Sequence, residues 1–159
     1  MTDIDAFTDR LDPDMCVVTA TVGAERSGCL VGFFSQCSIR PVRFAVWLSK
    51  ANHTYGLARR ADCLAVHLLT REQHGQAALF GGRTGDRTDK FSRAAWREGY
   101  GGSAVLEDVA AWFVGTVESR VDGGDHVGFV LTPVEWGSGS DGPLLRLGDV
   151  LDIDPGHPA

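Results

Sequence analysis

The stretch that decides the fold reads Gly28-Cys29-Leu30-Val31-Gly32-Phe33-Phe34-Ser35-Gln36-Cys37-Ser38-Ile39-Arg40-Pro41-Val42. Its apolar run is interrupted by Gly32, continues into small polar residues, and ends at Pro41. A glycine inside a strand pattern marks either a bulge or a place where a ligand approaches the main chain closely. Two interpretations therefore stay open here. The stretch is a bulged core strand, or it holds a flat aromatic ligand against the backbone near Gly32, with hydroxyls supplied by Ser35 and Ser38.

Composition sets the class of protein. The chain has 159 residues, of which 43% are hydrophobic and 23% charged, and this is typical of one globular domain. We therefore expect a single domain over residues 1–159. The 20 glycines favour a fold rich in strands and turns.

The charge pattern disfavours several partners. The formal net charge is −6 and the basic residues are scattered, so we expect no nucleic-acid partner. No apolar run is long enough to cross a bilayer, and the acidic start at residues 1–5 is unlike a signal peptide. We expect no membrane partner and a cytoplasmic protein.

The cysteines show no metal-binding pattern. Cys16, Cys29, Cys37 and Cys63 have no C-x-x-C spacing, and each lies in or beside an apolar run. They are predicted to be thiols in a reducing compartment, and no metal site is expected.

Secondary structure follows from periodicity and turn residues. Strand-like runs cover residues 15–22, 43–49, 64–69, 112–121, 126–132 and 143–147. The run 15–22 is expected to form a hairpin with the stretch that follows Gly28, and 112–121 to form one with 126–132. Short helices are predicted over residues 4–11, after Asn52, up to Gly81, where residues 70–73 match a capping box, and from Asp89 to about Trp96. Strict alternation of strand and helix is missing, which indicates a mainly antiparallel sheet closed into a barrel.

One helix start has a composition suited to anions. Asn52 is a plausible N-cap, and Lys50, His53 and Thr54 lie beside it, where free N–H groups and the helix dipole favour a phosphate. An ordinary capped surface helix is the alternative. The segment 81–90 is not a nucleotide-triphosphate loop, because Asp86 stands where such a loop has lysine, and no G-x-G-x-x-G is present.

An ordered set of motifs resembles the flavin reductase family of FMN-binding split barrels. The set spans about residues 13–147 and consists of Val17-Val18-Thr19, Gly28 to Ser38 with Pro41, Trp47-Leu48, residues 65–69 with Gln73, Asp89-Lys90-Phe91, Trp96 and Gly124-Asp125-His126. The resemblance implies a mainly β homodimer of six-stranded antiparallel split barrels with a few short helices. It also implies a flavin, FMN or FAD, that is reduced by NADH or NADPH and passed to the oxygenase component of a two-component monooxygenase.

The resemblance also implies roles for individual residues. Leu30, Val31, Gly32 and Phe33 would line the isoalloxazine ring, and its edge, ribityl chain or phosphate would contact Ser35, Gln36, Cys37 and Ser38. Lys50, His53 and Thr54 would bind the phosphate end, and Lys90 with Phe91 would close over the cofactor. His126 would lie near the nicotinamide, where it would position the amide or protonate reduced flavin. A turn histidine beside Asp125 is the simpler interpretation.

The chain departs from the family pattern at two places. Leu30-Val31-Gly32-Phe33 stands where members often have Thr-Ala-Asn-Ser, and Arg40-Pro41-Val42 replaces Asp-Pro-Pro. Two alternatives to a reductase therefore remain. One is a barrel that holds flavin, haem or a deazaflavin without reducing it. The other is a non-enzymatic partner subunit, in which Phe33, Phe34 and Trp47 serve a dimer interface.

Overall fold

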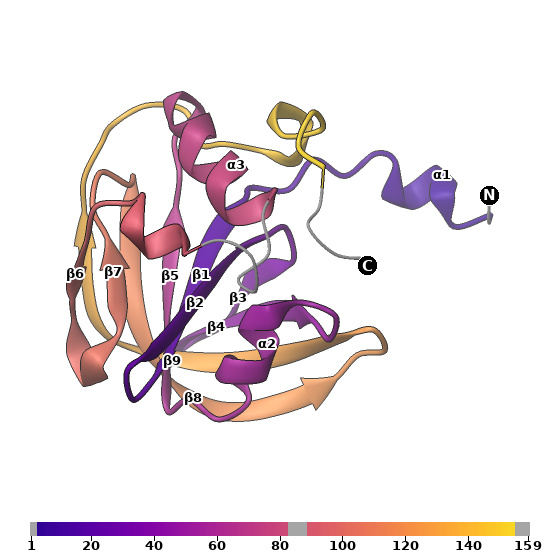
Figure 1. The fold of residues 1–159 in the computed structure, drawn as a ribbon. Coiled ribbons are helices and arrows are strands. Elements are labelled where there is room, and N and C mark those ends of the chain that lie inside the picture. The colour runs from indigo at the N-terminus through magenta and orange to yellow at the C-terminus, as the bar shows by residue number, and fades with distance from the viewer. Residues whose placement is uncertain (1–2, 83–88, 155–159) are drawn as a thin grey trace.

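The computed structural model describes residues 3–82 and 89–154. The protein is mainly β, with one large antiparallel sheet, a small two-stranded sheet and a few short helices (Figure 1). The strands are β1 Cys16–Val22, β2 Glu25–Val31, β3 Phe34–Ile39, β4 Val42–Ser49, β5 Cys63–Leu68, β6 Trp96–Glu98, β7 Ala104–Leu106, β8 Ala111–Asp122 and β9 His126–Ser138. The α-helices are α1 Asp5–Thr8, α2 His53–Ala58 and α3 His74–Gly81.

The large sheet curls until its two ends approach one another. Its strand order is β2-β1-β5-β8-β9-β4-β3, so the first and last strands are consecutive in the chain. Three Cα steps from Val31 to Phe34 span at most about 11 Å. The outer strands of a flat seven-stranded sheet would be about 29 Å apart at the usual spacing. The two residues Gly32 and Phe33 therefore bridge the gap between the ends of a strongly curved sheet.

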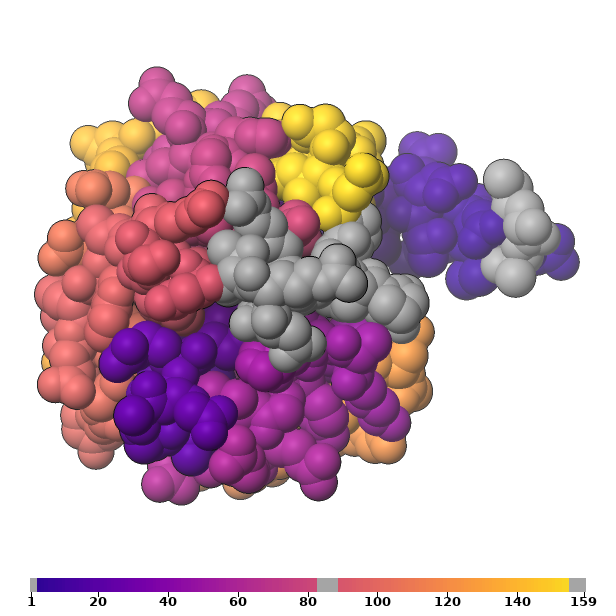
Figure 2. Space-filling model, in the orientation of Figure 1, coloured from indigo at the N-terminus to yellow at the C-terminus, as the bar shows by residue number. Residues whose placement is uncertain are grey.

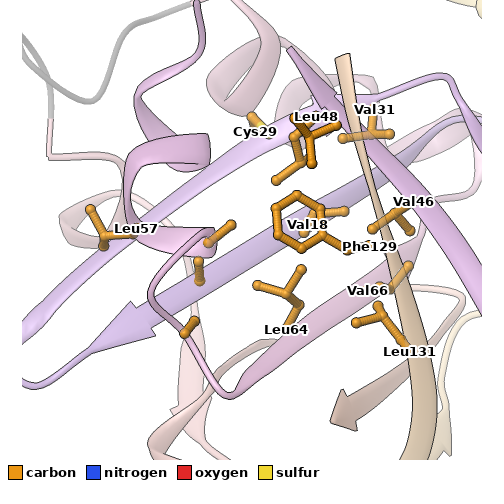
Figure 3. Close-up of a cluster of buried hydrophobic side chains, with 14 of the residues drawn as sticks. Val18, Cys29, Val31, Val46, Leu48, Leu57, Leu64, Val66, Phe129 and Leu131 are labelled. Carbon is orange, nitrogen blue, oxygen red and sulfur yellow. The ribbon is translucent and has the colours of Figure 1, made fainter. Parts of the chain in front are cut away.

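The concave side of this sheet holds the main core. Val18, Val31, Leu48 and Phe129 come from four different strands and meet in one cluster (Figure 3). Phe129 is completely buried, so truncation to alanine would leave a cavity and cost about 3–5 kcal/mol.

Strands β1 and β5, in the interior of the large sheet, are buried on both faces. Alternate residues of β1 enter the main core, while Val17 faces a second cluster that includes Phe80 of α3 and Leu106 of β7. This double burial explains why β1 reads as a nearly continuous apolar run rather than an alternating one. The second cluster fixes α3 and the β6–β7 hairpin to the outside of the sheet.

The predicted hairpins and helix caps are confirmed. β1 pairs with β2 and β8 pairs with β9, both antiparallel. The side chain of Asn52 accepts a hydrogen bond from Thr54 N at 2.8 Å at the start of α2. Gln73 Oε1 accepts from Thr70 N at 2.8 Å ahead of α3, as a capping box requires.

Five expectations about the fold were wrong. The stretch 28–42 is neither one bulged strand nor a loop, because it splits at Gly32-Phe33 into β2 and β3, and the main sheet has seven strands rather than six. β9 continues through Pro133, which it can do because the ladder shifts register there. Trp96 begins β6 instead of ending a helix, and residues 143–147 form only isolated bridges at Leu144 and Arg146.

The N-terminal segment stands away from the body of the protein. Figures 1 and 2 show α1 projecting beyond the sheet and its covering helices, and none of its residues is buried. Within residues 3–82 and 89–154, no helix is long and apolar enough to span a membrane. The segment 83–88, which contains Asp86 and part of the predicted loop, lies outside the described residues.

Candidate functional site

The link between β2 and β3 presents an aromatic ring at the surface. Phe33 is 59% exposed, and its carbonyl accepts a hydrogen bond from Trp47 N at 2.9 Å. The side of Gly32 that lacks a side chain faces Met15, because a Cβ there would lie 3.2 Å from Met15 Sδ. A ligand at this link would therefore approach the other side of Gly32 and the ring of Phe33.

His126 lies beside this exposed ring. The ring centroids of Phe33 and His126 are 5.1 Å apart, with an interplanar angle of 54°. His126 Nδ1 donates to Asp125 Oδ1 at 2.7 Å. This bond fixes the tautomer of the neutral imidazole and leaves Nε2 as the nitrogen that can accept a proton or a hydrogen bond. The side chain of His126 is 24% exposed, so solvent or a ligand can reach it.

The β8–β9 turn that carries His126 is tied to the end of β4. Lys50 Nζ lies 3.0 Å from Asp122 Oδ2, and Lys50 N donates to the carbonyl of Asp125. The hydrogen bond from His126, followed by its charge, lowers the pKa of Asp125. Hydrogen bonds from Lys50 and the Gly124 N–H lower the pKa of Asp122. Both carboxylates therefore stay ionised at neutral pH and hold the turn.

The ring of Trp47 supports the same turn from β4. Cβ atoms built at Gly123 and Gly128 would lie 2.7 Å and 2.8 Å from this ring, so both glycines are needed for the ring to pack. Trp47 was one of the aromatic residues considered for a dimer interface. The structure places it against its own hairpin.

The polar run after Phe33 forms β3 at one end of the sheet. Ser35, Gln36 and Cys37 are exposed, and Ser38 is half-buried. The pairing with β4 skips Cys37, since Gln36 is opposite Phe44 and Ser38 is opposite Arg43. Such bulges re-aim side chains and are common beside active sites. The strand thus presents hydroxyl, amide and thiol groups to solvent next to Phe33.

The start of α2 separates the three residues predicted for a phosphate. His53 is exposed at the first helical position, and Lys50 is exposed three residues earlier. Thr54 points inward, because its residue is fully buried and its Oγ1 lies 2.7 Å from Ser27 Oγ. Lys50 and His53 are therefore the two exposed side chains of the three, while Thr54 joins α2 to β2.

Lys90 and Phe91 are packed inside the protein. Lys90 is only 5% exposed, and its Nζ donates to Gly28 O at 3.0 Å and to Phe80 O at 2.9 Å. Burial lowers the pKa of Lys90, against a smaller opposite effect of the Cys29 thiol. Phe91 makes edge contacts with the rings of Phe80 and Trp96. The pair therefore fastens α3 to β2 from the side of the second cluster.

Leu30 and Val31 are also packed against the core. Val31 is buried in the main core, and Leu30 packs on the second cluster beside Gly81. Of the four residues predicted to line a flat ring, only Gly32 and Phe33 lie on the link between β2 and β3, which joins the two ends of the sheet.

His67 is a buried histidine that the sequence did not single out. Its Nδ1 donates to Val17 O at 2.9 Å, and its Nε2 accepts from Leu106 N at 3.0 Å. Burial lowers the pKa of His67 to about 4, so the ring is neutral and joins β1, β5 and β7. It serves structure rather than proton transfer. Across the described part of the chain, no three His, Cys, Asp or Glu side chains are grouped so that they could hold a metal ion.

An apolar groove is a feature that sequence reasoning missed. It has a volume of about 560 Å³ and is lined by residues that include Phe34, Phe44, Phe113 and Trp136. These residues come from β3, β4, β8 and β9, so no local pattern in the sequence brings them together.

Comparison of the sequence with protein families gives a match over most of the chain. A family described as "Flavin reductase like domain" matches residues 9–149. The chain belongs to the flavin reductase-like family.

Curated relatives of this flavin reductase-like chain include proteins named as reductases. A flavin reductase of Pseudomonas putida is 30% identical over 113 residues, covering 70% of this chain and 65% of the relative. The reductase subunit of a flavin-dependent monooxygenase from Rhodococcus jostii is 30% identical over 115 residues, covering 70% of this chain and 57% of the relative. The chain thus spans less than two thirds of the length of these relatives.

Solved structures show the same fold. A flavin reductase domain protein from Arthrobacter sp. FB24 superposes with a TM-score of 0.80 over 89% of this chain and 88% of the other, at 22% identity. At this identity the likeness concerns the fold alone.

The surface around Phe33 fits the chemistry of a flavin. An isoalloxazine has apolar faces and a polar edge, and the phosphate end of the cofactor is anionic. Phe33 offers an exposed ring, Ser35 and Gln36 are adjacent hydrogen-bonding groups, and Lys50 and His53 are cationic or become so on protonation. The fit is less complete than the family pattern implies. Thr54 and Lys90 are buried and use their polar groups on this chain's own atoms. The exposed side chains of Ser35, Gln36 and Lys50 also make hydrogen bonds within the chain.

Proposed function

We propose that this chain is a flavin reductase that transfers a hydride from NADH or NADPH to FMN or FAD. The observation that carries the proposal is the contact between the exposed ring of Phe33 and the ring of His126. It lies where the β2–β3 link joins the two ends of the sheet. Membership of the flavin reductase-like family and the named reductases among its relatives support the same activity.

The residues of this chain have binding and positioning tasks in the proposed reaction. A flavin, when bound, would supply the electron-accepting chemistry, since NADH or NADPH gives up a hydride, which is one proton and two electrons, and becomes NAD⁺ or NADP⁺. Phe33 and the backbone of Gly32 would orient the flat ring of that group. His126, held by Asp125, would accept a hydrogen bond from the nicotinamide amide at Nε2, or would deliver a proton from Nε2 after that nitrogen has taken one up from solvent.

We assign the remaining predicted site residues to two groups. Ser35, Gln36, Cys37 and Ser38 contact the polar edge and ribityl chain, and Lys50 and His53 contact the phosphate. The second group does not contact the cofactor but holds β2, α2 and α3 in place relative to the β2–β3 link. It consists of Leu30, Val31, Thr54, Lys90 and Phe91.

We also propose the assembly and its partner. The curled sheet is one half of a homodimer of split barrels, formed by a single domain over residues 1–159 with its core at about 13–147. Reduced flavin passes to a separate oxygenase component. This part of the proposal is supported by the name of the Rhodococcus relative, which is the reductase subunit of a flavin-dependent monooxygenase. The close approach of the sheet ends at Gly32-Phe33 supports a barrel.

Flavin binding and reduction test the proposal together. The visible spectrum of purified protein is recorded with and without FMN and FAD, and NADH or NADPH is then added without oxygen. A flavin band that bleaches supports the reductase. If neither flavin binds and neither nicotinamide is oxidised, the proposal is refuted.

A second candidate is a carrier that binds flavin or another planar cofactor without reducing it. The inward hydroxyl of Thr54 and the carbonyl-bound amine of Lys90 favour it, because they leave fewer groups for the cofactor. Retention of a chromophore that NAD(P)H does not bleach would distinguish the carrier from the reductase.

A further inference from the structure

The N-terminal arm, residues 3–11, has an apolar side that nothing in the described chain covers. Ile4, Phe7 and Leu11 recur at helical spacing and are 61%, 65% and 54% exposed. Helix α1 within the arm has no buried residue and projects from the body (Figures 1 and 2). Exposed apolar residues gathered on one side of a segment mark an interaction surface.

The apolar groove is the complementary surface on the same chain. Trp136 at its edge is 70% exposed and Val42 is 46% exposed. The residues that line the groove come from β3 to β5, β8, β9 and the adjoining turns, and none comes from the arm. The arm therefore does not fill the groove of its own chain in this structure.

The charges of the two surfaces are opposite. The arm contains Asp3, Asp5 and Asp9 against the single cation Arg10. Two arginines adjoin the groove: Arg40 precedes its Pro41, and Arg43 Nε donates to its Thr132. No carboxylate among the described residues forms an ion pair with these arginines.

We propose that the arm of one copy lies in the apolar groove of a second copy, and that the exchange is reciprocal. A two-fold axis makes both contacts at once, since each copy supplies one arm and one groove. Ile4, Phe7 and Leu11 enter the groove, while Asp3 and Asp9 approach the arginines at its edge. The inference rests on the proposed homodimer but not on flavin reduction.

Sedimentation of the full chain over a range of concentrations tests the exchange. Phe7→Asp disrupts the arm, and Val42→Asp places a carboxylate in the groove. Burying one phenylalanine stabilises by about 1.5–3 kcal/mol, and two equivalent contacts are lost, so each variant is expected to weaken dimerisation by at least about 100-fold. Leu151→Asp is the matched control, because Leu151 is 76% exposed and lies outside both surfaces.

A mixture of the two variants provides the sharper test. A pair formed by one Phe7→Asp copy and one Val42→Asp copy keeps one intact arm and one intact groove that face each other. The mixture should therefore dimerise more tightly than either variant alone. Circular dichroism of each variant checks that it is folded.

Three results would overturn the inference. Dimers of unchanged affinity in both variants would show that another surface joins the copies, and a wild-type monomer at all concentrations would refute the dimer as well. A loss of thermal stability in Phe7→Asp at every concentration, without a change of mass, would place the arm in its own groove. None of these results depends on whether flavin is reduced.

Discussion

The imidazole of His126 lies next to the phenyl ring of Phe33, with 5.1 Å between their centroids, although 93 positions of sequence separate them. β9 brings His126 to this point, because Ser49 of β4 is its partner across the ladder and Trp47 of β4 is bonded to Phe33. The site is thus a product of the sheet's curvature, which delivers the β2–β3 link and the β8–β9 turn to one place.

Replacing His126 by alanine should slow NAD(P)H oxidation while flavin binding is retained. Loss of a positioned proton donor lowers turnover by roughly 100- to 10,000-fold, and loss of an amide hydrogen bond lowers it by up to roughly 10-fold. Steady-state rates and flavin titrations measure the two effects separately. His74→Ala is the control, since His74 is also bonded to an aspartate, Asp152, at 3.0 Å but lies on α3. Equal losses in both variants would contradict a role for His126.

Gly128→Ala should destabilise the protein, because the new methyl group would lie 2.8 Å from the ring of Trp47. Forcing an extra methyl group into a packed site costs about 1–3 kcal/mol. Gly56→Ala serves as the control. A Cβ added at Gly56 in α2 would have no other atom within 4 Å. Alanine in a helix is more stable than glycine by about 0.5–1 kcal/mol. Thermal unfolding should give changes of opposite sign, and a harmless Gly128→Ala would contradict the packing of Trp47 on the hairpin.

The two lysines of the chain should behave differently in flavin-free protein. Lys90→Met leaves the carbonyls of Gly28 and Phe80 without their donor and should cost about 1–3 kcal/mol of unfolding free energy. Lys50→Met removes an exposed pair with Asp122 and should change stability by less than about 1 kcal/mol. Denaturant unfolding compares them. If Lys90→Met is as stable as wild type without flavin, Lys90 does not hold β2 to α3.

His67 should make folding sensitive to acid. Its folded pKa is about 4, below the usual value of 6.5, so the unfolded chain binds a proton that the folded chain excludes. The stability from this group is fully present above pH 6.5 and is lost as the pH falls toward 4. By pH 4 the loss amounts to about 3 kcal/mol.

A glutamine at position 67 isolates this contribution from that of the carboxylates. His67→Gln should be less stable than wild type at pH 7. The difference in unfolding free energy between the two proteins should decrease by about 3 kcal/mol between pH 7 and pH 4. A constant gap for His67→Gln would mean that the buried ring is protonated in the folded protein.

Local signals in the sequence predicted the local structure. The hairpin turn before β2, the Asn52 cap and the Thr70-Gln73 box each depend on residues a few positions apart, and each is present. The division of residues 28–42 between β2 and β3 could not be predicted in this way. Two residues at Gly32-Phe33 cannot show that the strands on either side belong to opposite ends of a sheet, because that depends on pairings with β1 and β4.

The candidate site was predictable to a similar degree. Resemblance to the family drew attention to Phe33 and His126, and the structure brings these two together. It could not show that Lys90 would find its acceptors at Gly28 and Phe80, or that Thr54 would turn toward Ser27. Such contacts depend on side chains that only the completed fold places side by side.

The most direct test of the central claim is anaerobic bleaching of flavin by NADH or NADPH, with the flavin in large excess over the protein. The account predicts that the flavin band disappears in many turnovers per protein molecule with at least one pairing of FMN or FAD with NADH or NADPH. Bleaching should be slowed by His126→Ala and not by His74→Ala. A flavin band that persists with wild-type protein under all four pairings would contradict the assignment of this chain as a flavin reductase.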